Sequence, residues 1–510
     1  MAKLIEKENN NFHLTDDDVY AINPFFRLRN EEEFVVFYGK EGRGNYRLHR
    51  THAIILALCD GEKKVGDIVR SVTPFVNKEH SVNRVGEAKK HVYKIISTFK
   101  KSYDEQQNPN VKRDPSQAAL ISVSNVKKMS PAKPPVYDAK DFLPKSPFLQ
   151  SDNDYQVRER VPSEILWHVT SDCATDCQYC YLKRRKIPQS NLVSKERMLE
   201  LLAEAKQIGV FSIEPSGGDI LLYPYLFDFL DAITEHEFMP VRISTKAYLS
   251  KETAKHLAEY PTIFEIQFSM DSTVAEVADY LTQTPGFHTR TEESIRNALE
   301  TGLKVATKAV ITPYNVCTIP RLYRDLKNIG VGDIRTATYC RSAYHHKDRL
   351  FNHIEDYDWL DKKLDVLKKE FPDDQIGYQN GRPMVGPRDI ELRQEAWKGR
   401  TRCAAGRTSF LICADGKVIP CEQLPENEEM FVGDLTTQSI EEVWNSKKLL
   451  EKTIYYPKEK FKNTICYECE EIDNCHTKMG YCIRDTYHEC GTIYEAAPGC
   501  PKSDRFVRKF

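Results

Sequence analysis

The stretch that decides the fold is Ile165-Leu-Trp-His-Val-Thr170-Ser-Asp-Cys173-Ala-Thr-Asp-Cys177-Gln-Tyr-Cys180. It begins with a short apolar and β-branched run, which is typical of a buried strand, and continues directly into a loop with three cysteines. Three thiolates this close together can hold three corners of an iron–sulfur cubane and leave its fourth iron without a protein ligand. Zinc or free thiols are the alternative, but a structural zinc site usually takes four protein ligands, commonly in C-x2-C pairs.

Five further apolar or β-branched runs follow this stretch, and helical patterns lie between them. The predicted strands are 165–170, 210–215, 241–245, 263–270, 304–312 and 333–339. The clearest helix begins at Ser194, a residue type that caps helices, and stops at Gly209. Others are predicted at 290–300 and 318–329. The alternation indicates an α/β fold with a parallel sheet curled into a partial (β/α)6 barrel over 160–370, whose active site lies at the C-terminal ends of the strands.

Composition and charge exclude several classes of protein. Lys and Arg number 73 and Asp and Glu number 75, so no net field points to nucleic acid. The basic run 183–186 is interpreted as a solvated helix face. No segment resembles a signal peptide or is long enough to span a bilayer, which predicts a cytoplasmic protein. In a reducing cytosol the 15 cysteines favour metal binding over disulfides, and eight of them fall between Cys413 and Cys500.

The N-terminal part, residues 15–104, predicts a small α+β domain of winged-helix type. Strands are expected at 33–38 and around 46–48, followed by a short helix that Thr51 caps and Asp60-Gly61 stops. A second short helix is expected at 65–72, and a longer one carries Val82, Val85 and later apolar residues at three- and four-residue steps. Residues 105–159 are rich in proline and polar residues and predict a semi-extended linker. Residues 371–402 form a bridging region before the cysteine-rich part at 403–510.

The cysteine loop resembles the signature of the radical S-adenosylmethionine (SAM) superfamily, C-x3-C-x2-C after the first barrel strand with an aromatic residue, here Tyr179, before the third cysteine. The resemblance implies that Cys173, Cys177 and Cys180 hold a [4Fe–4S] cluster whose open iron chelates SAM. It further implies that Gly217-Gly218-Asp219, after the second strand, contacts the SAM amino group, and that Ser269, which ends the fourth strand, contacts the ribose.

One position departs from that pattern. Many relatives carry an arginine about thirteen residues beyond the serine, where this chain has Thr282. The residue that anchors the SAM carboxylate is therefore open, and Lys308 and Arg341 are the candidates from sequence.

The C-terminal part resembles a SPASM domain, a module that adds auxiliary Fe–S clusters to peptide-modifying radical enzymes. The matching elements are Cys403, Gly416-x4-Cys421, Cys466-x2-Cys469-x5-Cys475, Cys482, and Cys500 after 17 intervening residues. The resemblance implies a first auxiliary [4Fe–4S] cluster on Cys403, Cys421 and Cys482. A second would lie on Cys466, Cys469, Cys475 and Cys500, and zinc is the alternative, since C-x2-C pairs suit it too.

Cys413 is left over from this assignment. It lies in a predicted strand that runs into a tight turn, where alternation places it on the same face as Leu411. It is interpreted either as a buried, inert thiol or as the fourth ligand of the first auxiliary cluster, and the ligand interpretation is weakly preferred because Cys413 lies within ten residues of Cys403.

The N-terminal part resembles the small peptide chaperone of pyrroloquinoline-quinone synthesis, also known as the recognition element of ribosomally made, post-translationally modified peptides (RiPPs). The matching run is Tyr46-Arg-Leu-His, Leu58-Cys-Asp-Gly61 and Val65-Gly-Asp-Ile-Val69. Such domains take a leader peptide as an added strand on a sheet edge. A DNA-binding winged helix is the alternative.

Together the resemblances imply a radical SAM enzyme that modifies a precursor peptide through a 5′-deoxyadenosyl radical, with an electron donor such as flavodoxin or ferredoxin. The product could be a thioether, a carbon–carbon cross-link or an epimerised residue, with sactipeptide-type thioether formation slightly favoured. A sulfatase-maturase-like enzyme, or a non-catalytic Fe–S or zinc scaffold that binds peptide or DNA, are the other hypotheses.

Overall fold

The computed structural model describes residues 14–31, 34–40, 43–75, 83–102, 105–106, 115–123, 132–143, 158–182, 187–340, 342, 344, 347–379, 395, 397–400 and 402–503. The predicted helix face at 183–186, Val82 and Arg341 lie outside these residues. The chain divides into two compact units, Met1–Asp154 and Tyr155–Phe510. Each is described by itself below.

The N-terminal unit contains three helices, as the sequence predicts, and a three-stranded antiparallel sheet whose first strand was not predicted. The strands are β2 (Phe26–Asn30), β3 (Val35–Gly39) and β4 (Gly44–Leu48), with β2 and β4 at the edges. The helices are α1 (Arg50–Ala57), α2 (Val65–Val72) and α3 (Arg84–Phe99). The ring of Phe99 from α3 makes edge contacts with Phe37 and Tyr46, at centroid separations of 5.4 and 5.1 Å, and so ties the longest helix to the sheet.

A second sheet, in the order β5-β1-β6, differs from the prediction. β5 (Asp60–Lys64) and β6 (Leu120–Ser122) both pair antiparallel with β1 (Val19–Ile22). Asp60-Gly61 therefore starts a strand, since the Asp60 carboxylate accepts hydrogen bonds from the backbone amides of Glu62 and Lys63 and Gly61 has a positive φ of 84°. The cap of α1 is His49 rather than Thr51.

The predicted linker is also partly ordered against this unit. Besides β6, the phenol of Tyr137 accepts a hydrogen bond of 2.9 Å from the amide of Leu28 on β2, and the side chain of Asn30 donates to the carbonyl of Asp141. Proline-rich composition indicates an extended chain, but it does not reveal that a short apolar run within it can complete a sheet.

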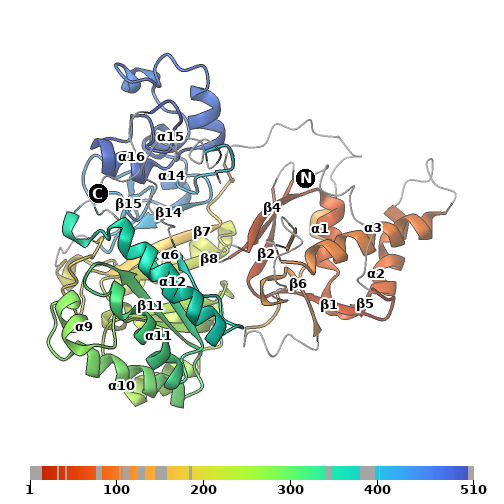
Figure 1. Cartoon of the computed structure of the whole chain (residues 1–510). Helices are drawn as coiled ribbons and strands as arrows, with labels where there is room; N and C mark the ends of the chain where they lie inside the picture. The colour runs from red at the N-terminus through yellow and green to blue at the C-terminus, as the bar shows by residue number, and fades with distance from the viewer. Residues whose placement is uncertain are drawn as a thin grey trace. The chain divides into compact units, whose positions relative to one another are not determined.

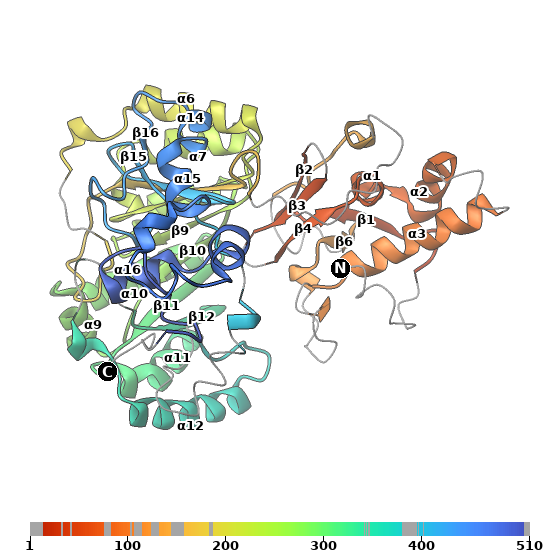
Figure 2. The ribbon, with the colours of Figure 1, turned by 90° about the horizontal axis from the view of Figure 1, so that it is seen from above.

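The C-terminal unit begins with the predicted six parallel strands, and their order is that of a partial barrel. They are β7 (Glu164–Thr170), β8 (Ser212–Gly217), β9 (Val241–Thr245), β10 (Ile263–Ser269), β11 (Val305–Ile311) and β12 (Asp333–Thr338). β7 pairs with β8, and β9 to β12 pair in sequence order; β8 and β9 are neighbours at the junction of the two ladders. Figures 1 and 2 show the connecting helices outside the curved sheet.

The sequence predicts three of the described barrel helices, the one that begins at Ser194 and those at 290–300 and 318–329, but not the other four. The barrel helices are α6 (Lys195–Ile208), α7 (Leu226–Glu235), α8 (Lys251–Ala258), α9 (Ala275–Thr282), α10 (Phe287–Glu300), α11 (Ile319–Asn328) and α12 (Ile354–Glu370). Ser194 caps α6 by accepting from the amide of Arg197, and Gly209 ends it in the left-handed conformation.

Strands from outside the predicted barrel extend it at both edges. β13 (Tyr378–Gln379) pairs parallel with β12. At the other edge β14 (Ser409–Ile412), from the cysteine-rich part, pairs parallel with β7, and β15 (Lys417–Ile419) and β16 (Gly433–Asp434) follow antiparallel. The short helices α14 (Ile440–Trp444), α15 (Lys447–Thr453) and α16 (Ile483–Cys490) complete this part.

One hydrophobic core joins the barrel and the cysteine-rich part. Trp167 of β7 and Trp444 of α14 belong to the same buried cluster, and the indole of Trp444 donates to the carbonyl of Glu159 at 3.1 Å. The two parts therefore share one core.

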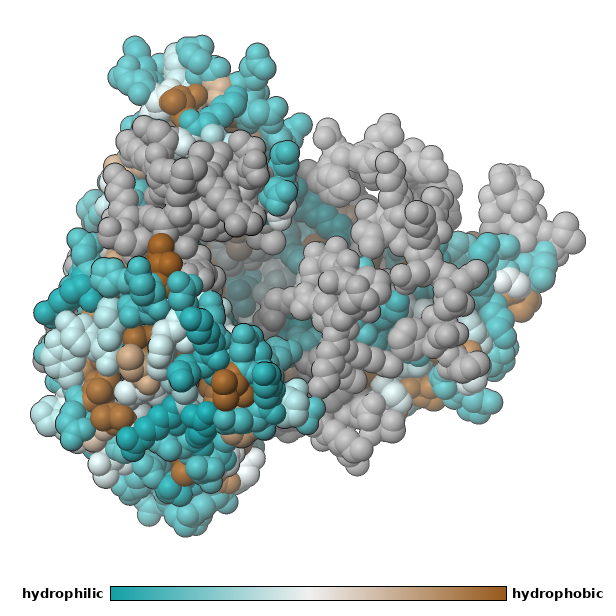
Figure 3. Space-filling view, in the orientation of Figure 1, coloured by the Kyte–Doolittle hydropathy of each residue, from teal (hydrophilic) through white to brown (hydrophobic). Residues whose placement is uncertain are grey.

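Among the residues described, no helix is long and apolar enough to cross a membrane. On the face shown in Figure 3, hydrophobic residues lie singly or in small groups among hydrophilic ones.

Candidate active site

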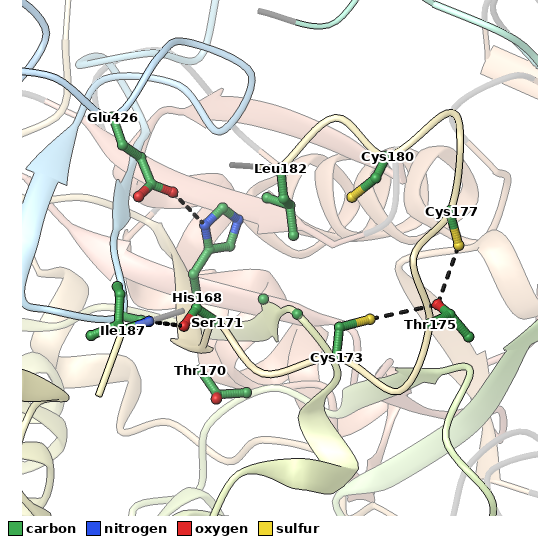
Figure 4. Close-up of a pocket in the computed structure, with 13 residues that line it drawn as sticks. His168, Thr170, Ser171, Cys173, Thr175, Cys177, Cys180, Leu182, Ile187 and Glu426 are labelled. Carbon is green, nitrogen blue, oxygen red and sulfur yellow. Dashed lines mark hydrogen bonds and ion pairs between the residues drawn. The ribbon is translucent and has the colours of Figure 1, made fainter. Parts of the chain in front are cut away.

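The three cysteines of the first loop line one pocket at the C-terminal ends of β7 and β8, where the fold class predicts the site. Cys173 is exposed, Cys180 is half-buried and Cys177 is buried. The hydroxyl of Thr175 lies 3.6 Å from the sulfur of Cys173 and 3.2 Å from that of Cys177 (Figure 4). The loop thus turns its thiols toward a common space.

The end of α9 holds this loop in place. The amide of Asp176 donates to the carbonyl of Thr282, and the amide of Gln178 donates to the carbonyl of Leu281, both at 2.9 Å. The side-chain amide of Gln178 also donates to the carbonyl of Tyr280. Thr282, at the position where many relatives carry an arginine, is fully buried and its hydroxyl donates to the carbonyl of Ala278 at 2.8 Å. It supports the loop and offers no group to a ligand.

Gly217 and Gly218 let the end of β8 approach the cysteine loop. A Cβ on Gly217, which has a φ of 134°, would lie 2.3 Å from the carbonyl oxygen of Thr170, and a Cβ on Gly218 would lie 2.1 Å from that of Asp172. The amide of Gly218 donates to the carbonyl of Thr170 at 2.8 Å. Both glycines line the pocket, so a ligand there would meet backbone.

Asp219 fixes the end of β9, and the contact of its motif with the SAM amino group stays a prediction. Its buried carboxylate accepts from the hydroxyl of Thr245 and from the amides of Lys246 and Ala247 at 2.7–2.8 Å, and from the amide of Leu221 at 3.1 Å. Burial raises its pKa, and these hydrogen bonds lower it. The carboxylate is fully engaged in fixing the end of β9 and is not among the groups that line the pocket.

Tyr179 of the cysteine loop lies next to Lys246, which follows β9. The phenol of Tyr179 donates to the carboxylate of Asp271, and the ammonium of Lys246 lies over the Tyr179 ring, 5.4 Å from its centroid. Burial, together with the nearby Asp271 carboxylate, raises the pKa of Tyr179, so this side chain stays a neutral donor. Tyr179 packs against the small apolar cluster around Tyr339.

Ser269 ends β10 as predicted and is half-buried, in register with Lys308 of β11. Neither residue lines the pocket of the cysteine loop. The ribose role of Ser269 therefore stays a prediction.

Burial raises the pKa of the loop thiols that it covers. The pKa of Cys177 is raised, and that of Cys180 is raised to about 11. These thiols are protonated at neutral pH until a metal displaces the proton, since it is the thiolate that binds metal.

The structure brings together the three cysteines assigned to the first auxiliary cluster. Burial, with a contribution from the nearby Glu422 and Cys403, raises the pKa of Cys421 to about 12. Cys403 likewise raises the pKa of Cys482, which begins α16. The guanidinium of Arg484 acts on the pKa of all three thiols in the opposite direction, which suits a site that collects negative charge.

The four cysteines assigned to the second auxiliary cluster also gather. Burial raises the pKa of Cys466 to about 12, and the thiols of Cys500, Cys475 and Cys469 contribute to this shift. The ammonium of Lys502 donates to the sulfur of Cys469 at 3.3 Å. Cys475 lies in a short π-helical segment, Asp473–Met479, of the kind often found at functional sites.

Cys413 follows β14 and is fully buried. It packs in an apolar cluster with Leu411, Ile419 and Tyr481, and Cys403 and Cys421 pack against the same cluster. This placement suits an inert thiol and is also near the first auxiliary set, so the ligand role stays a prediction.

The donor sets fit clusters in their chemistry. Among the described residues no three His, Cys, Asp or Glu side chains stand close enough together to hold one metal ion. A cubane spreads its thiolates over different iron atoms, so it requires thiols that face a common space, as Cys173, Cys177 and Cys180 do.

Sequence reasoning missed a histidine–glutamate pair in the pocket. His168 of β7 and Glu426, from the loop after β15, lie 3.7 Å apart between Nδ1 and Oε1 (Figure 4). The Nε2 atom of His168 is buried and has no hydrogen-bond partner within the described part of the chain. His168 could have been noticed in the sequence, because it is a polar residue inside an otherwise apolar strand. No feature of the sequence indicates that Glu426 lies in the site.

Tyr181, which follows the third cysteine, was also missed. Glu422, burial, and the thiols of Cys180 and Cys421 all raise its pKa. One tyrosine therefore lies near both the pocket loop and the first auxiliary set.

Comparisons with known proteins agree with this geometry. Residues 167–326 match the radical SAM superfamily, and residues 403–470 match the SPASM iron–sulfur cluster-binding domain. A GTP 3′,8-cyclase from Sulfurovum is 32% identical over 147 residues, 28% of this chain and 44% of the relative. The chain thus spans about half the length, or less, of such curated relatives.

Two further comparisons cover more of the chain. A PqqA peptide cyclase from Rhodopseudomonas palustris is 22% identical over 361 residues, 69% of this chain and 89% of the relative. Streptococcus suis SuiB bound to SAM superposes with a TM-score of 0.59 at 17% identity, over 94% of this chain and 99% of SuiB. SuiB bound to the precursor peptide SuiA gives a TM-score of 0.58 at 16% identity.

The two domain matches fall on the two places where the structure gathers cysteines. The first contains the loop with Cys173, Cys177 and Cys180, and the second begins at Cys403. The chain thus contains a region that is similar to the radical SAM superfamily and, after it, a region that is similar to the SPASM iron–sulfur cluster-binding domain.

Proposed function

We propose that this chain modifies a ribosomally made precursor peptide. The observation that supports the proposal is the order of parts in one chain: a small unit with a three-stranded sheet, a pocket lined by three cysteines, and two further cysteine sets. The PqqA peptide cyclase and SuiB, which are similar to this chain over most of its length, are named for a peptide substrate or were solved with one.

The bound cofactors would supply the reactive species: one-electron reduction of SAM at the cluster yields a 5′-deoxyadenosyl radical that takes a hydrogen atom from a substrate carbon. The electron would come from a donor such as flavodoxin or ferredoxin. The chain's own residues hold the loop through α9, bring the backbone of Gly217 and Gly218 to the ligand, and keep Tyr179 neutral.

The N-terminal unit is proposed as the leader-binding element. In its three-stranded sheet β4 is an edge strand, whereas the edge of β2 is partly taken by Tyr137. A leader peptide would add as a strand beside β4, where main-chain hydrogen bonds supply affinity. Because β6 belongs to this unit, the fragment to test is 1–154 rather than 1–104.

The bond that is formed is proposed to be a thioether of the sactipeptide type, with a carbon–carbon cross-link as the alternative. Three cysteines gather at the first auxiliary set, Cys403, Cys421 and Cys482. If Cys413 is not a ligand, the fourth iron of that cluster is open to a substrate thiolate.

The decisive experiment uses the full-length chain, reconstituted anaerobically with iron and sulfide, and candidate precursor peptides encoded by short reading frames beside its gene. We expect SAM cleavage to 5′-deoxyadenosine and a mass loss of two hydrogens per bond in one of these peptides. The variant with Cys173, Cys177 and Cys180 all changed to Ala should lose about four irons and all cleavage. SAM cleavage with no peptide bound or altered would refute the peptide substrate and leave the radical SAM assignment intact.

A further inference from the structure

His168 is a buried histidine on the pocket side of β7, and one nitrogen of its ring has no partner. Trp167 and Val169, on either side of it, join the hydrophobic core, whereas His168 lines the pocket. Only 3% of His168 is exposed, and its Nε2 atom is buried with no hydrogen-bond partner within the described part of the chain. A buried polar nitrogen of this kind is unfavourable unless a molecule that enters the pocket supplies its partner.

The other nitrogen of the ring lies beside a carboxylate. Nδ1 of His168 is 3.7 Å from Oε1 of Glu426, and the two side chains are only 4% and 11% exposed. The backbone of Glu426 is anchored in turn, since its amide donates to the phenol of Tyr344. Figure 4 shows the ring of His168 between Glu426 on one side and Leu182 and the cysteine loop on the other. A carboxylate beside Nδ1 favours the tautomer with its proton on Nδ1, which leaves Nε2 as an acceptor toward the pocket.

His168 and Glu426 are also the titratable side chains of the pocket that no cluster requires. Among the described residues that line it, the other titratable side chains are the thiols of Cys173, Cys177 and Cys180, which are assigned to the cluster. The pocket therefore contains one oriented imidazole that can accept a proton from a molecule bound beside the cysteine loop.

The proposed reaction requires such an acceptor. When a peptide loses two hydrogens as one bond forms, the first leaves as a hydrogen atom to the 5′-deoxyadenosyl radical. The new bond then joins a carbon radical to a group that still carries its hydrogen, so the second hydrogen must leave as a proton together with one electron. An oxidised iron–sulfur cluster on the first auxiliary set can take the electron, and Glu426 lies in the segment that follows Cys421 of that set.

We propose that His168, oriented by Glu426, is a catalytic residue that accepts at Nε2 the proton that the peptide loses as the new bond forms. The S–H bond, or the C–H bond in a carbon–carbon cross-link, breaks and its proton passes to Nε2. Its two electrons and the unpaired electron of the carbon radical give the new two-electron bond and one electron for the auxiliary cluster. Glu426 is a positioning residue, which fixes the tautomer and stabilises the charged ring. This inference rests on the proposed function and names the proton acceptor for it.

The test compares the reconstituted full-length chain with its His168→Gln variant, which keeps a hydrogen-bonding group but cannot take up the proton. The probes are SAM, a chemical reductant and the precursor peptide that the wild type modifies, prepared from deuterated amino acids. We expect wild-type iron content, wild-type SAM cleavage without peptide, and deuterium transfer from the peptide into 5′-deoxyadenosine. The yield of modified peptide per 5′-deoxyadenosine should fall about 100- to 10,000-fold, as for the loss of a general base.

Variants of Glu426 test its positioning role. Glu426→Gln should lower kcat for the peptide about 10- to 100-fold, as for the loss of one interaction with a charged group, and leave KM unchanged. Glu426→Asp keeps the charge and should recover part of this loss. The matched control is His288→Gln, because His288 of α10 also lies beside a glutamate, 4.0 Å between its Nε2 and Oε2 of Glu292, but does not line the pocket. This control should match the wild type in every measurement.

The outcomes separate this inference from the proposed function. A wild-type yield of modified peptide per 5′-deoxyadenosine in His168→Gln would refute the proton transfer and leave the peptide substrate intact. Loss of iron, of SAM cleavage without peptide or of deuterium transfer in that variant would also overturn it, since His168 would then support the site itself. A wild-type chain that modifies no peptide would refute the proposed function, and this step with it, before any variant is compared.

Discussion

At the scale of single residues, the glycines of the pocket offer the cleanest test of the cysteine loop. Gly218→Ala places a Cβ 2.1 Å from the carbonyl oxygen of Asp172 and must push the loop away. We expect a destabilisation of about 1–3 kcal/mol and the loss of about four irons per chain, since only one cluster site is displaced. Iron analysis and thermal unfolding measure the two effects.

Gly332→Ala is the matched control for this substitution. Nothing lies within 4 Å of the position that its Cβ would take, and its φ is not positive, so iron content and stability should be unchanged. Full iron content in Gly218→Ala would show that the loop tolerates displacement and that close backbone approach is not what the glycine provides.

Individual site residues differ in how well their roles follow from sequence. The spacing of Cys173, Cys177 and Cys180 predicts a shared site, and the structure places all three on one pocket. The role of Asp219 could not be inferred, because its partners Thr245 and Lys246 become neighbours only when β8 and β9 pack together.

At the scale of elements, α1 is predicted to be sensitive to acid. Burial, with contributions from the nearby His49, His91 and Lys94, lowers the pKa of His52 to about 4. Between pH 6.5 and 4 the unfolded chain binds a proton that the folded unit does not, so the stability present above pH 6.5 falls as the pH drops. We expect a loss of about 1–2 kcal/mol between pH 7 and pH 5.

Hydrogen exchange of the full-length chain, corrected for the intrinsic rate, can follow this loss in peptides from α1 and α3. His52→Gln cannot take up the proton and should flatten the difference between the two pH values. Equal protection at pH 7 and pH 5 in the wild type would mean that His52 is already charged in the folded unit.

The position of β14 in the sheet could not be predicted from the sequence. Its apolar residues predict a strand, but no local sequence pattern indicates that this strand pairs parallel with β7, more than 200 residues earlier in the chain. A similar long-range pairing places β6 beside β1. The strands of the barrel follow local periodicity, and their bounds agree with the prediction to within about two residues; among the helices, α6, α10 and α11 were predicted, whereas α7, α8, α9 and α12 were not.

The pairing of β14 with β7 predicts that a change in the cysteine-rich part weakens the barrel. Trp444 is fully buried, lies 5.8 Å from the ring of Phe410 on β14, and receives the guanidinium of Arg158 over its ring at 4.3 Å. Trp444→Ala should destabilise the C-terminal unit by about 3–5 kcal/mol and increase hydrogen exchange in β7 as well as in β14. Trp359→Ala, at a half-buried tryptophan of α12, should have a smaller effect and spare β7.

If Trp444→Ala loosened α14 and β14 while β7 kept its protection, the two parts would fold independently, and the shared core would be only a contact surface. Denaturant unfolding would then show two transitions in place of one.

At the scale of the whole molecule, the division into two units predicts that leader binding and SAM cleavage reside in different units. A single truncation tests this prediction. All three cysteine sets, the pocket and the shared core lie in 155–510, and no strand of that unit pairs with 1–154 among the described residues. A chain of residues 155–510 should therefore bind about twelve irons and cleave SAM at a rate close to that of the full chain when no peptide is present. Because it lacks β4, it should lose the gain in affinity that a leader confers on a precursor peptide.

Fluorescence polarisation with a labelled leader, on 1–154 and 155–510 separately, measures where that affinity resides. Binding by 155–510 and none by 1–154 would move leader recognition into the barrel, whereas failure of 155–510 to take up iron would show that the N-terminal unit is needed to fold the site.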